Sequence, residues 1–315
     1  MGLNNNIEVI GNYAFYGCCG FTGSLTIPDK IASLGIGAFS GCSGCCTLSS
    51  IKLPKKLKRI NDNLFENCSE ISVTKNIFSN CENLISIGNK AFYGCEKMIF
   101  SLLLPDTINL IGEKAFYGCK NLNGMLHIPK TISLIGSYAF AGCSGLTGRI
   151  KIPETMNIIN EGLFHNCSCL NGNLTLNQLT RICNYSFKNT NFERIEYYGV
   201  TSPQCELYIG FDENYVIYTE KNYEDLYFCK FNISKILTDV DKKKKNMMKL
   251  LVIILPCAFG TIALIVAGIF IYVCVKKISI EGPSTNPTFC NSKYPELNIS
   301  TLNNQPLSNH LLPDN

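Results

Sequence analysis

Hydrophobic positions recur with a period of 24 residues over much of the chain. The clearest adjacent copies are IGEKAFYGCKNLNGMLHIPKTISL, from Ile111 to Leu134, and IGSYAFAGCSGLTGRIKIPETMNI, from Ile135 to Ile158. The two copies agree at eleven positions, namely Ile, Gly, Ala, Phe, Gly, Cys, Leu, Gly, Ile, Pro and Thr. A unit of this length cannot bury its apolar face alone, so the pattern predicts a solenoid of stacked copies.

Each copy combines a short alternating segment with a turn. Apolar and polar residues alternate in Leu126-His127-Ile128 and Ile150-Lys151-Ile152, which is typical of half-buried strands, and a proline ends each one. We expect parallel strands about 4.8 Å apart with Leu and Ile inside. Gly136 is expected to permit a tight bend, after which one phenylalanine per turn enters the core. The repeat phenylalanines are Phe15, Phe39, Phe65, Phe92, Phe116, Phe140, Phe164 and Phe187.

Two segments depart from this pattern. A half-unit from Phe78 to Cys81 is inserted into the array, and we expect it to bulge at a loop. From about Ile195 the chain becomes rich in tyrosine and lacks the Ala-Phe-x-Gly-Cys element, which predicts a C-terminal cap. Cys205 and Cys229 are the only cysteines of this region, and the sequence leaves open whether they form a disulfide or two buried thiols.

A long apolar segment follows the repeats. Residues 250–275 carry no charged side chain and would rise about 39 Å as a helix, more than the roughly 30 Å hydrocarbon core of a bilayer. We predict one transmembrane helix here, preceded by a basic segment at 242–249 and followed by a flexible, aperiodic tail at 276–315. The repeats then occupy 1–194 and the cap 195–241.

The orientation of this helix depends on two conflicting signals. The lysines at 242–245 and 249 precede it, which by the positive-inside rule would place the repeats in the cytosol. The tail, however, holds an Asn-Pro-x-Phe turn and a Tyr-x-x-Leu segment, which have the form of endocytic signals read by clathrin-type adaptors in the cytosol. We therefore expect the repeats outside the cell. The sorting residues are Asn286, Pro287, Phe289, Tyr294 and Leu297.

Asn-x-Ser/Thr sequences supply candidate N-glycosylation sites, as expected for an extracellular array. The N-terminal segment has no charged stretch followed by an apolar one, so no secretory leader is recognised, and we expect either a truncated start or unconventional export. The candidate asparagines are Asn67, Asn166, Asn173, Asn184 and Asn232, with a sixth, Asn298, in the tail.

Composition narrows the classes of function. Hydrophobic residues make up 46% of the 315 residues, which is enough for a sizeable core. The formal charge is only +4, and the basic residues of the repeats form no stripe with interleaved aromatics, so we expect no nucleic-acid partner. The chain has no Gly-x-Ser-x-Gly, P-loop or His-Glu-x-x-His motif and only three dispersed histidines, which argues against an enzyme.

Seven of the eighteen cysteines lie three residues after a repeat phenylalanine. We interpret these as a column of buried thiols that act as small hydrophobic groups. The alternative, a zinc site at Cys42-x-x-Cys45-Cys46, lacks a second Cys-x-x-Cys pair, so no metal or cofactor is expected. The column consists of Cys18, Cys42, Cys68, Cys95, Cys119, Cys143 and Cys167.

The repeat unit IGxxAFxGCxxLxGxLxIPxxIxx, the cap, the single helix and the Asn-Pro-x-Phe tail together resemble the bacterial-surface-antigen A-like (BspA-like) leucine-rich-repeat proteins, which are numerous in parasitic protists such as trichomonads. The resemblance covers the whole chain. It implies an α/β-type leucine-rich-repeat solenoid, mostly short parallel strands and turns, and a role in attachment to host cells, matrix or other microbes.

The strand alternation also predicts a ligand-binding face. With Leu and Ile inside, the residues between them point outward in two rows, which mix hydroxyl groups with modest positive charge. The first row holds Thr26, Lys52, Leu103, His127, Lys151 and Thr175, and the second holds Ser24, Ser50, Ser101, Met125, Arg149 and Asn173.

Two functions follow from these features. The first is a single-pass plasma-membrane protein whose repeats bind a protein or glycan on another cell or matrix, and whose tail recruits adaptors. The alternative is an intracellular scaffold anchored to an internal membrane with cytosolic repeats, which the lysine cluster and the missing leader favour.

Overall fold

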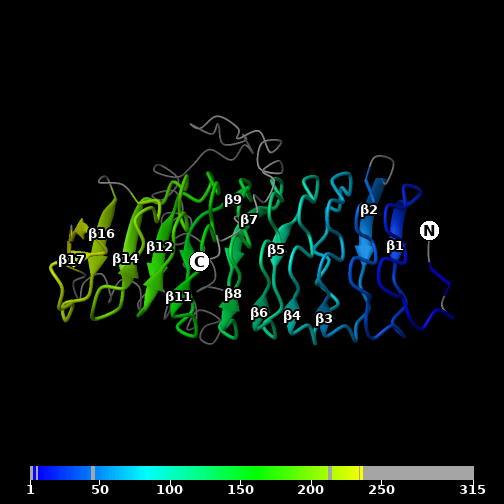
Figure 1. Cartoon of the computed structure of the whole chain (residues 1–315), viewed down its shortest axis with the longest axis horizontal. Helices are drawn as coiled ribbons and strands as arrows, with labels where there is room; N and C mark the ends of the chain where they lie inside the picture. The colour runs from blue at the N-terminus through cyan, green and yellow to red at the C-terminus, as the bar shows by residue number, and fades with distance from the viewer. Residues whose placement is uncertain (1–2, 5, 44–46, 212–214, 234, 237–315) are drawn as a thin grey trace, which may run out of the picture.

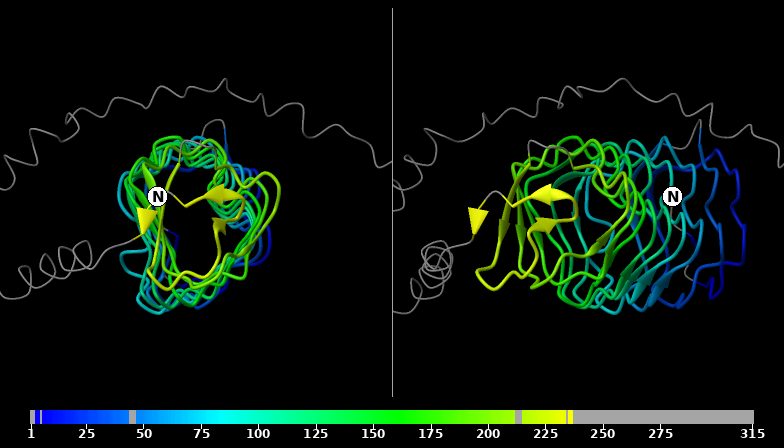
Figure 2. Two further views of the ribbon diagram at one scale, coloured as in Figure 1. Left: turned by 90° about the vertical axis from the view of Figure 1, so that its left-hand side faces the viewer. Right: turned by 60° about the vertical axis from the view of Figure 1, so that its left-hand side comes forward.

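The computed structural model describes residues 3–4, 6–43, 47–211, 215–233 and 235–236. They form a β-solenoid in which turns of chain stack along one axis, from β1 (Thr22–Thr26) to β16 (Val216–Thr219) (Figure 1). Viewed along the axis, the turns superpose as one rounded coil (Figure 2). The strands of successive turns pair in parallel, so the predicted solenoid of short parallel strands is confirmed.

The strands of the Leu-x-Ile segments form one side of the coil, called here the long-strand row. Inward side chains of this row, such as Leu126, Ile150 and Leu174, are buried, as the alternation predicts. β1 pairs with β2, β5 with β7, and β7 with β9, while β10, β12, β14, β16 and β19 pair in that order. The further bounds are β2 (Thr47–Lys52), β5 (Ser101–Leu103), β7 (Asn123–His127), β9 (Leu146–Thr147), β10 (Ile150–Lys151), β12 (Asn173–Leu176), β14 (Arg194–Tyr197) and β19 (Lys235–Ile236).

A second side of the coil, the short-strand row, consists of two-residue strands. β3, β4, β6 and β8 pair in that order, as do β11, β13 and β15. Each strand of the central turns places one residue in the core, such as Ile111 or Ile135. The bounds are β3 (Arg59–Ile60), β4 (Ser86–Ile87), β6 (Leu110–Ile111), β8 (Leu134–Ile135), β11 (Ile158–Ile159), β13 (Arg181–Ile182) and β15 (Gln204–Cys205).

The α/β label expected for the repeats is wrong, because the residues that the structure describes contain no helix. The segment around each Ala-Phe-x-Gly-Cys element is a series of turns. Two of its residues adopt left-handed backbone conformations, for example Lys114 at φ 53° and Gly118 at φ 72°. A left-handed residue interrupts a right-handed helix. At the second of these positions the chain uses glycine or asparagine, which tolerate this conformation best.

The repeat phenylalanines form a continuous ladder through the core. Consecutive rings from Phe15 to Phe187 are stacked, with centroids 5.2 to 6.1 Å apart. Their predicted alignment is confirmed. The ladder also includes Phe211, whose ring lies 5.0 Å from that of Phe187 and which the repeat pattern did not identify. Offset stacking of this kind stabilises each pair by about 0.5–1.5 kcal/mol beyond the area it buries.

The repeat cysteines lie beside this ladder. Cys68, Cys95, Cys119, Cys143 and Cys167 are fully buried, which confirms their interpretation as core thiols. Burial raises the pKa of the Cys95 thiol to about 12, so the group stays protonated. Within the described ranges no three His, Cys, Asp or Glu side chains gather as metal ligands, and the other two cysteines of the zinc alternative, at 45 and 46, lie outside those ranges.

One expectation about an irregular position is wrong. The half-unit does not bulge outward: Phe78 is 2% exposed, and its ring packs edge-on against Phe92 and Phe116. Burying an apolar insertion of this size in the core stabilises the folded state more than leaving it in a surface loop would. At Gly136 two turns approach closely, because a Cβ atom there would lie 2.5 Å from the backbone nitrogen of Glu113, so their packing requires the glycine.

The parallel sheets continue through the region predicted to be a C-terminal cap, as far as β19 (Lys235–Ile236). β14 and β16 extend the long-strand row, β15 extends the short-strand row, and an antiparallel hairpin of β17 (Tyr227–Phe228) and β18 (Phe231–Asn232) follows. The predicted basic segment, transmembrane helix and tail lie outside the described residues. Among those residues, no helix has the length and apolar character to cross a membrane.

Candidate ligand-binding face

The predicted outward residues of the long-strand row are exposed over most of its length. Register pairs bring Thr26 beside Lys52 and Leu103 beside His127. All four side chains face solvent, because their neighbours along each strand fill the core. Ser24, Met125, Arg149 and Lys151 are also exposed. These eight residues are called here the ligand face.

The prediction is wrong for Thr175, which is 7% exposed. Thr175 pairs with Glu196 of β14, and the buried Glu196 carboxylate accepts hydrogen bonds from the Thr175 hydroxyl at 3.3 Å and from the half-buried Asn173 amide at 3.1 Å. Arg194 donates to the same carboxylate at 2.6 Å and stacks over the Tyr218 ring. This network closes the C-terminal end of the ligand face.

The second predicted row is not continuous. Met125 pairs with Thr147 rather than with Arg149, and Ser101 pairs with Asn123. Gly148, which has a left-handed backbone at φ 78°, lies between β9 and β10. Arg149 therefore lies between two strands, although its side chain is still exposed.

The ligand face combines an apolar centre with cationic flanks. Leu103 and Met125 are 57% and 61% exposed. Lys52, Arg149 and Lys151 have no acidic ion-pair partner among the described residues, whereas lysines elsewhere, such as Lys97 with Glu70, do. Exposed apolar side chains with unpaired charges beside them are characteristic of binding surfaces, because both gain on contact with a complementary partner.

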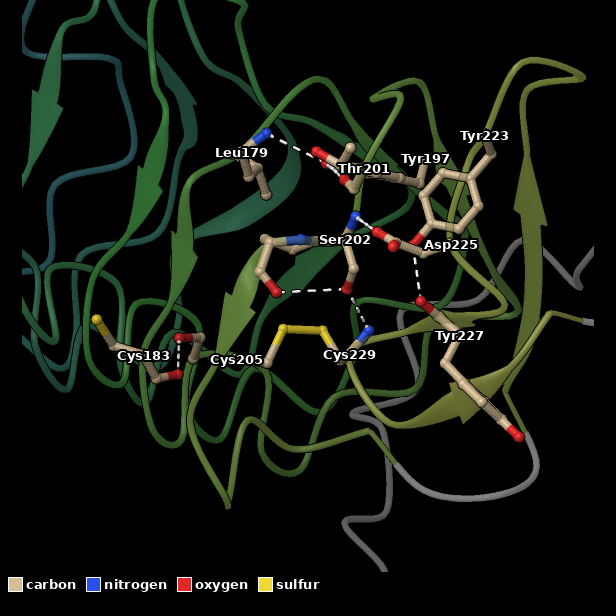
Figure 3. Close-up of a disulfide and its surroundings, with 12 residues drawn as sticks. Leu179, Cys183, Tyr197, Thr201, Ser202, Cys205, Tyr223, Asp225, Tyr227 and Cys229 are labelled. Carbon is tan, nitrogen blue, oxygen red and sulfur yellow. Dashed lines mark hydrogen bonds between the residues drawn. A yellow bond between two sulfur atoms is a disulfide. The ribbon is translucent and has the colours of Figure 1, made fainter.

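A disulfide bond links two segments at the C-terminal end of the array. Cys205 of β15 and Cys229 form a disulfide with Cα atoms 5.3 Å apart (Figure 3). The hydroxyl of Ser202 accepts a hydrogen bond from the backbone N–H of Cys229, and the phenol of Tyr223 donates to the carbonyl of Tyr227. In this view the thiol of Cys183 points away from the disulfide (Figure 3).

The candidate glycosylation sites differ in accessibility. Asn232 and Asn67 are exposed, whereas Asn166, Asn173 and Asn184 are only partly exposed. The Asn166 amide oxygen accepts a hydrogen bond from Asn189, and that of Asn184 accepts one from the backbone of Tyr208. The structural role of Asn67, Asn166 and Asn189 is a left-handed turn that other repeats form with glycine. Asn232 is therefore the best placed site for a glycan.

A tyrosine surface on the turn side of the coil was missed by sequence reasoning. Tyr93 and Tyr117 follow consecutive ladder phenylalanines, and their rings stack with centroids 5.0 Å apart and planes 10° apart. Further along, Tyr138, His165, Tyr185 and Tyr208 continue as neighbouring rings. The sequence does contain a signal for this surface, because tyrosine recurs one residue after Phe15, Phe92 and Phe116. The strand alternation, however, predicts only the outward residues of the strands.

Several solved structures are similar to this chain. A leucine-rich repeat protein from Bacteroides ovatus is 20% identical over 73% of this chain and 73% of that chain, with a TM-score of 0.38. A leucine rich repeat protein of T. pallidum is 23% identical over 63% and 72%, with a TM-score of 0.36. A leucine rich cell surface protein from Faecalibacterium prausnitzii is 17% identical over 75% and 85%, with a TM-score of 0.31.

The repeat sequence itself carries the assignment to a family. No curated protein sequence matches the chain. Residues 1–99 and 85–203, however, match the BspA type leucine rich repeat region in six copies. Together the two ranges cover more than half of the 315 residues. Repeats of this type are a binding scaffold rather than a catalytic one. The chain therefore belongs to the family of BspA-type leucine-rich-repeat proteins.

Proposed function

We propose that this chain is a single-pass cell-surface receptor or adhesin whose ligand face binds a protein or glycan on another cell or on matrix. The observation that carries the proposal is the ligand face itself, with exposed Leu103 and Met125 flanked by cations that have no acidic ion-pair partner in the described part of the chain. A solenoid presents such a face as a long, nearly flat surface, which suits an extended partner.

The C-terminal sequence supports the membrane part of the proposal. The apolar segment at 250–275 anchors the chain in the lipid bilayer, and the tail motifs at 286–289 and 294–297 recruit a clathrin-type adaptor. Bound ligand is then carried into the cell by endocytosis.

One observation favours a second function. The lysines at 242–245 and 249 outnumber those after the apolar segment, which by the positive-inside rule favours cytosolic repeats and hence an intracellular scaffold. The two functions differ in topology, so topology is the quantity to measure.

The topology experiment uses full-length chain with an epitope at each end, expressed in cells. If the chain is a surface receptor, antibody should label the N-terminal epitope on intact cells and the C-terminal epitope only after permeabilisation. Glycan mapping gives an independent answer: a glycan on Asn232 places the repeats in the secretory lumen, whereas one on Asn298 alone places the tail there. Labelling of the C-terminal epitope on intact cells would refute the receptor.

A charge reversal tests the ligand face. Arg149→Glu with Lys151→Glu should weaken adhesion of expressing cells to the target surface by about fivefold to thirtyfold, since loss of two cation contacts at a rim amounts to roughly 1–2 kcal/mol. Lys58→Glu is the matched control, because Lys58 is an exposed lysine beside β3 on the short-strand row. An equal loss in the control would show that the effect is not specific to the ligand face.

A further inference from the structure

A depression on the turn side of the coil lies at the stacked tyrosines, away from the strands of the ligand face. It has a volume of about 310 Å³ and is lined by side chains of Ser43, Asn67, Ser69, Tyr93, Glu96 and Tyr117. We propose that this depression, called here the tyrosine pocket, binds one neutral pyranose unit of a glycan. The inference rests on the proposed surface function and deepens it by naming a ligand class and a second site.

The aromatic part of the pocket supplies an apolar wall. Tyr93 and Tyr117 stack on each other, and the stack ends at Tyr93, because the equivalent residue of the preceding turn is Glu66. Gly94 and Gly118 follow the two tyrosines, so no side chain rises from those positions of the lining. An aromatic ring that lines a depression attracts the C–H face of a sugar ring, which is apolar and carries partial positive charge.

The polar part of the pocket supplies donors and acceptors. The hydroxyls of Ser43, Ser69, Tyr93 and Tyr117 and the side-chain amide of Asn67 make no hydrogen bond with another described residue. Five such groups around one depression match a ligand that carries several hydroxyls at its edge. An apolar wall with few convergent polar groups is the usual form of a small-molecule site.

The charges near the pocket favour a neutral sugar over an acidic one. The carboxylate of Glu96 pairs with Lys120 at 3.4 Å, and that of Glu66 pairs with Lys90 at 3.8 Å. Both of these carboxylates are therefore paired, and no lysine or arginine is among the described residues that line the depression to bind a carboxylate or sulfate. The ammonium of Lys90 also lies over the Tyr93 ring, 5.9 Å from its centre.

The size of the pocket limits the ligand to one sugar ring. A volume of about 310 Å³ is at the lower end of the range for small-molecule sites. The neighbouring units of a glycan chain would extend over the turn surface outside the pocket.

The test uses full-length chain in lipid nanodiscs, because sugar-headed detergents would compete. Saturation-transfer NMR and calorimetry are run with glucose, galactose, mannose, N-acetylglucosamine and N-acetylgalactosamine, and with N-acetylneuraminic acid as the charged comparison. We expect binding of at least one neutral sugar at millimolar concentration, with saturation strongest on ring C–H protons. Tyr93→Ala should weaken this binding about tenfold, and Tyr93→Phe should weaken it less.

Tyr16→Ala is the matched control, since Tyr16 occupies the same repeat position but lines no part of the pocket. Equal loss in Tyr16→Ala, no binding of any neutral sugar, or binding of N-acetylneuraminic acid alone would each overturn the proposal. So would a glycan on Asn67 of chain from its native cells, because the chain's own sugar would then fill the pocket. These outcomes do not depend on the result of the epitope labelling, so the sugar-binding proposal and the topology proposal can be refuted independently.

Discussion

The thiol of Cys119 donates a hydrogen bond to the carbonyl oxygen of Phe92, the ladder phenylalanine of the preceding turn, with Sγ and O 3.0 Å apart. The same bond joins Cys95 to Phe65 and Cys143 to Phe116. A cysteine at this position fills the core and donates a second hydrogen bond to a buried carbonyl that also accepts one from a backbone N–H.

Replacement of this thiol should destabilise the array. Cys119→Ala removes one of the two hydrogen bonds that the Phe92 carbonyl accepts, the other coming from the backbone N–H of Cys95, and opens a small cavity, so we expect the free energy of unfolding to fall by about 1–2 kcal/mol. The measurement is urea unfolding followed by circular dichroism. Cys183→Ala is the control, because Cys183 is only partly buried, and it should lower the free energy of unfolding by less.

A methyl group at Gly136 should force two turns apart. Its Cβ would lie 2.5 Å from the nitrogen of Glu113, and both atoms belong to stiff backbone, so Gly136→Ala should cost about 1–3 kcal/mol or more. Gly20→Ala has nothing within 4 Å of the new Cβ and should change stability little. Thermal melting of both variants compares the two sites, and a stable Gly136→Ala would contradict the close packing.

Reduction of the disulfide should loosen the C-terminal end. Cys205 and Cys229 are 24 residues apart, and closing a loop of that length stabilises the folded state by about 3 kcal/mol in the chain-entropy view. We expect a reductant to increase hydrogen exchange in β15 to β18 first. The variant Cys205→Ala with Cys229→Ala should show that exchange without reductant and no further response to it.

Lowering the pH should reduce the free energy of unfolding through His165, which lies on the turn side of the coil. Burial, and then the charge of Lys188, lower the pKa of the His165 imidazole, whose ring lies beside those of Tyr138 and Tyr185. The unfolded chain therefore takes up a proton first, so this group leaves stability unchanged above pH 7 and reduces it as the pH falls through about 6.5. His165→Phe should flatten that part of the stability curve, measured by urea unfolding between pH 5 and 8. A curve identical to the parent would exclude His165 as the cause.

Much of the ligand face could be predicted, but its ends and register could not. Thr26, Lys52 and Lys151 are exposed because alternation along a strand is a local rule that holds in any half-buried sheet. Thr175 follows the same rule and is still buried, because the next turn presents Glu196 beside it. Which side chain lies beside a strand depends on the neighbouring turn, as the pairing of Met125 with Thr147 instead of Arg149 shows.

The repeat by itself determined that this chain forms a solenoid with stacked phenylalanines, because a unit of fixed length places identical residues one above another. Only the tertiary structure decided that Phe78 enters the core, that Phe211 extends the ladder, and that Tyr93 and Tyr117 line a pocket. These features depend on contacts between turns whose sequences differ, and such contacts are set by packing rather than by the period of the pattern.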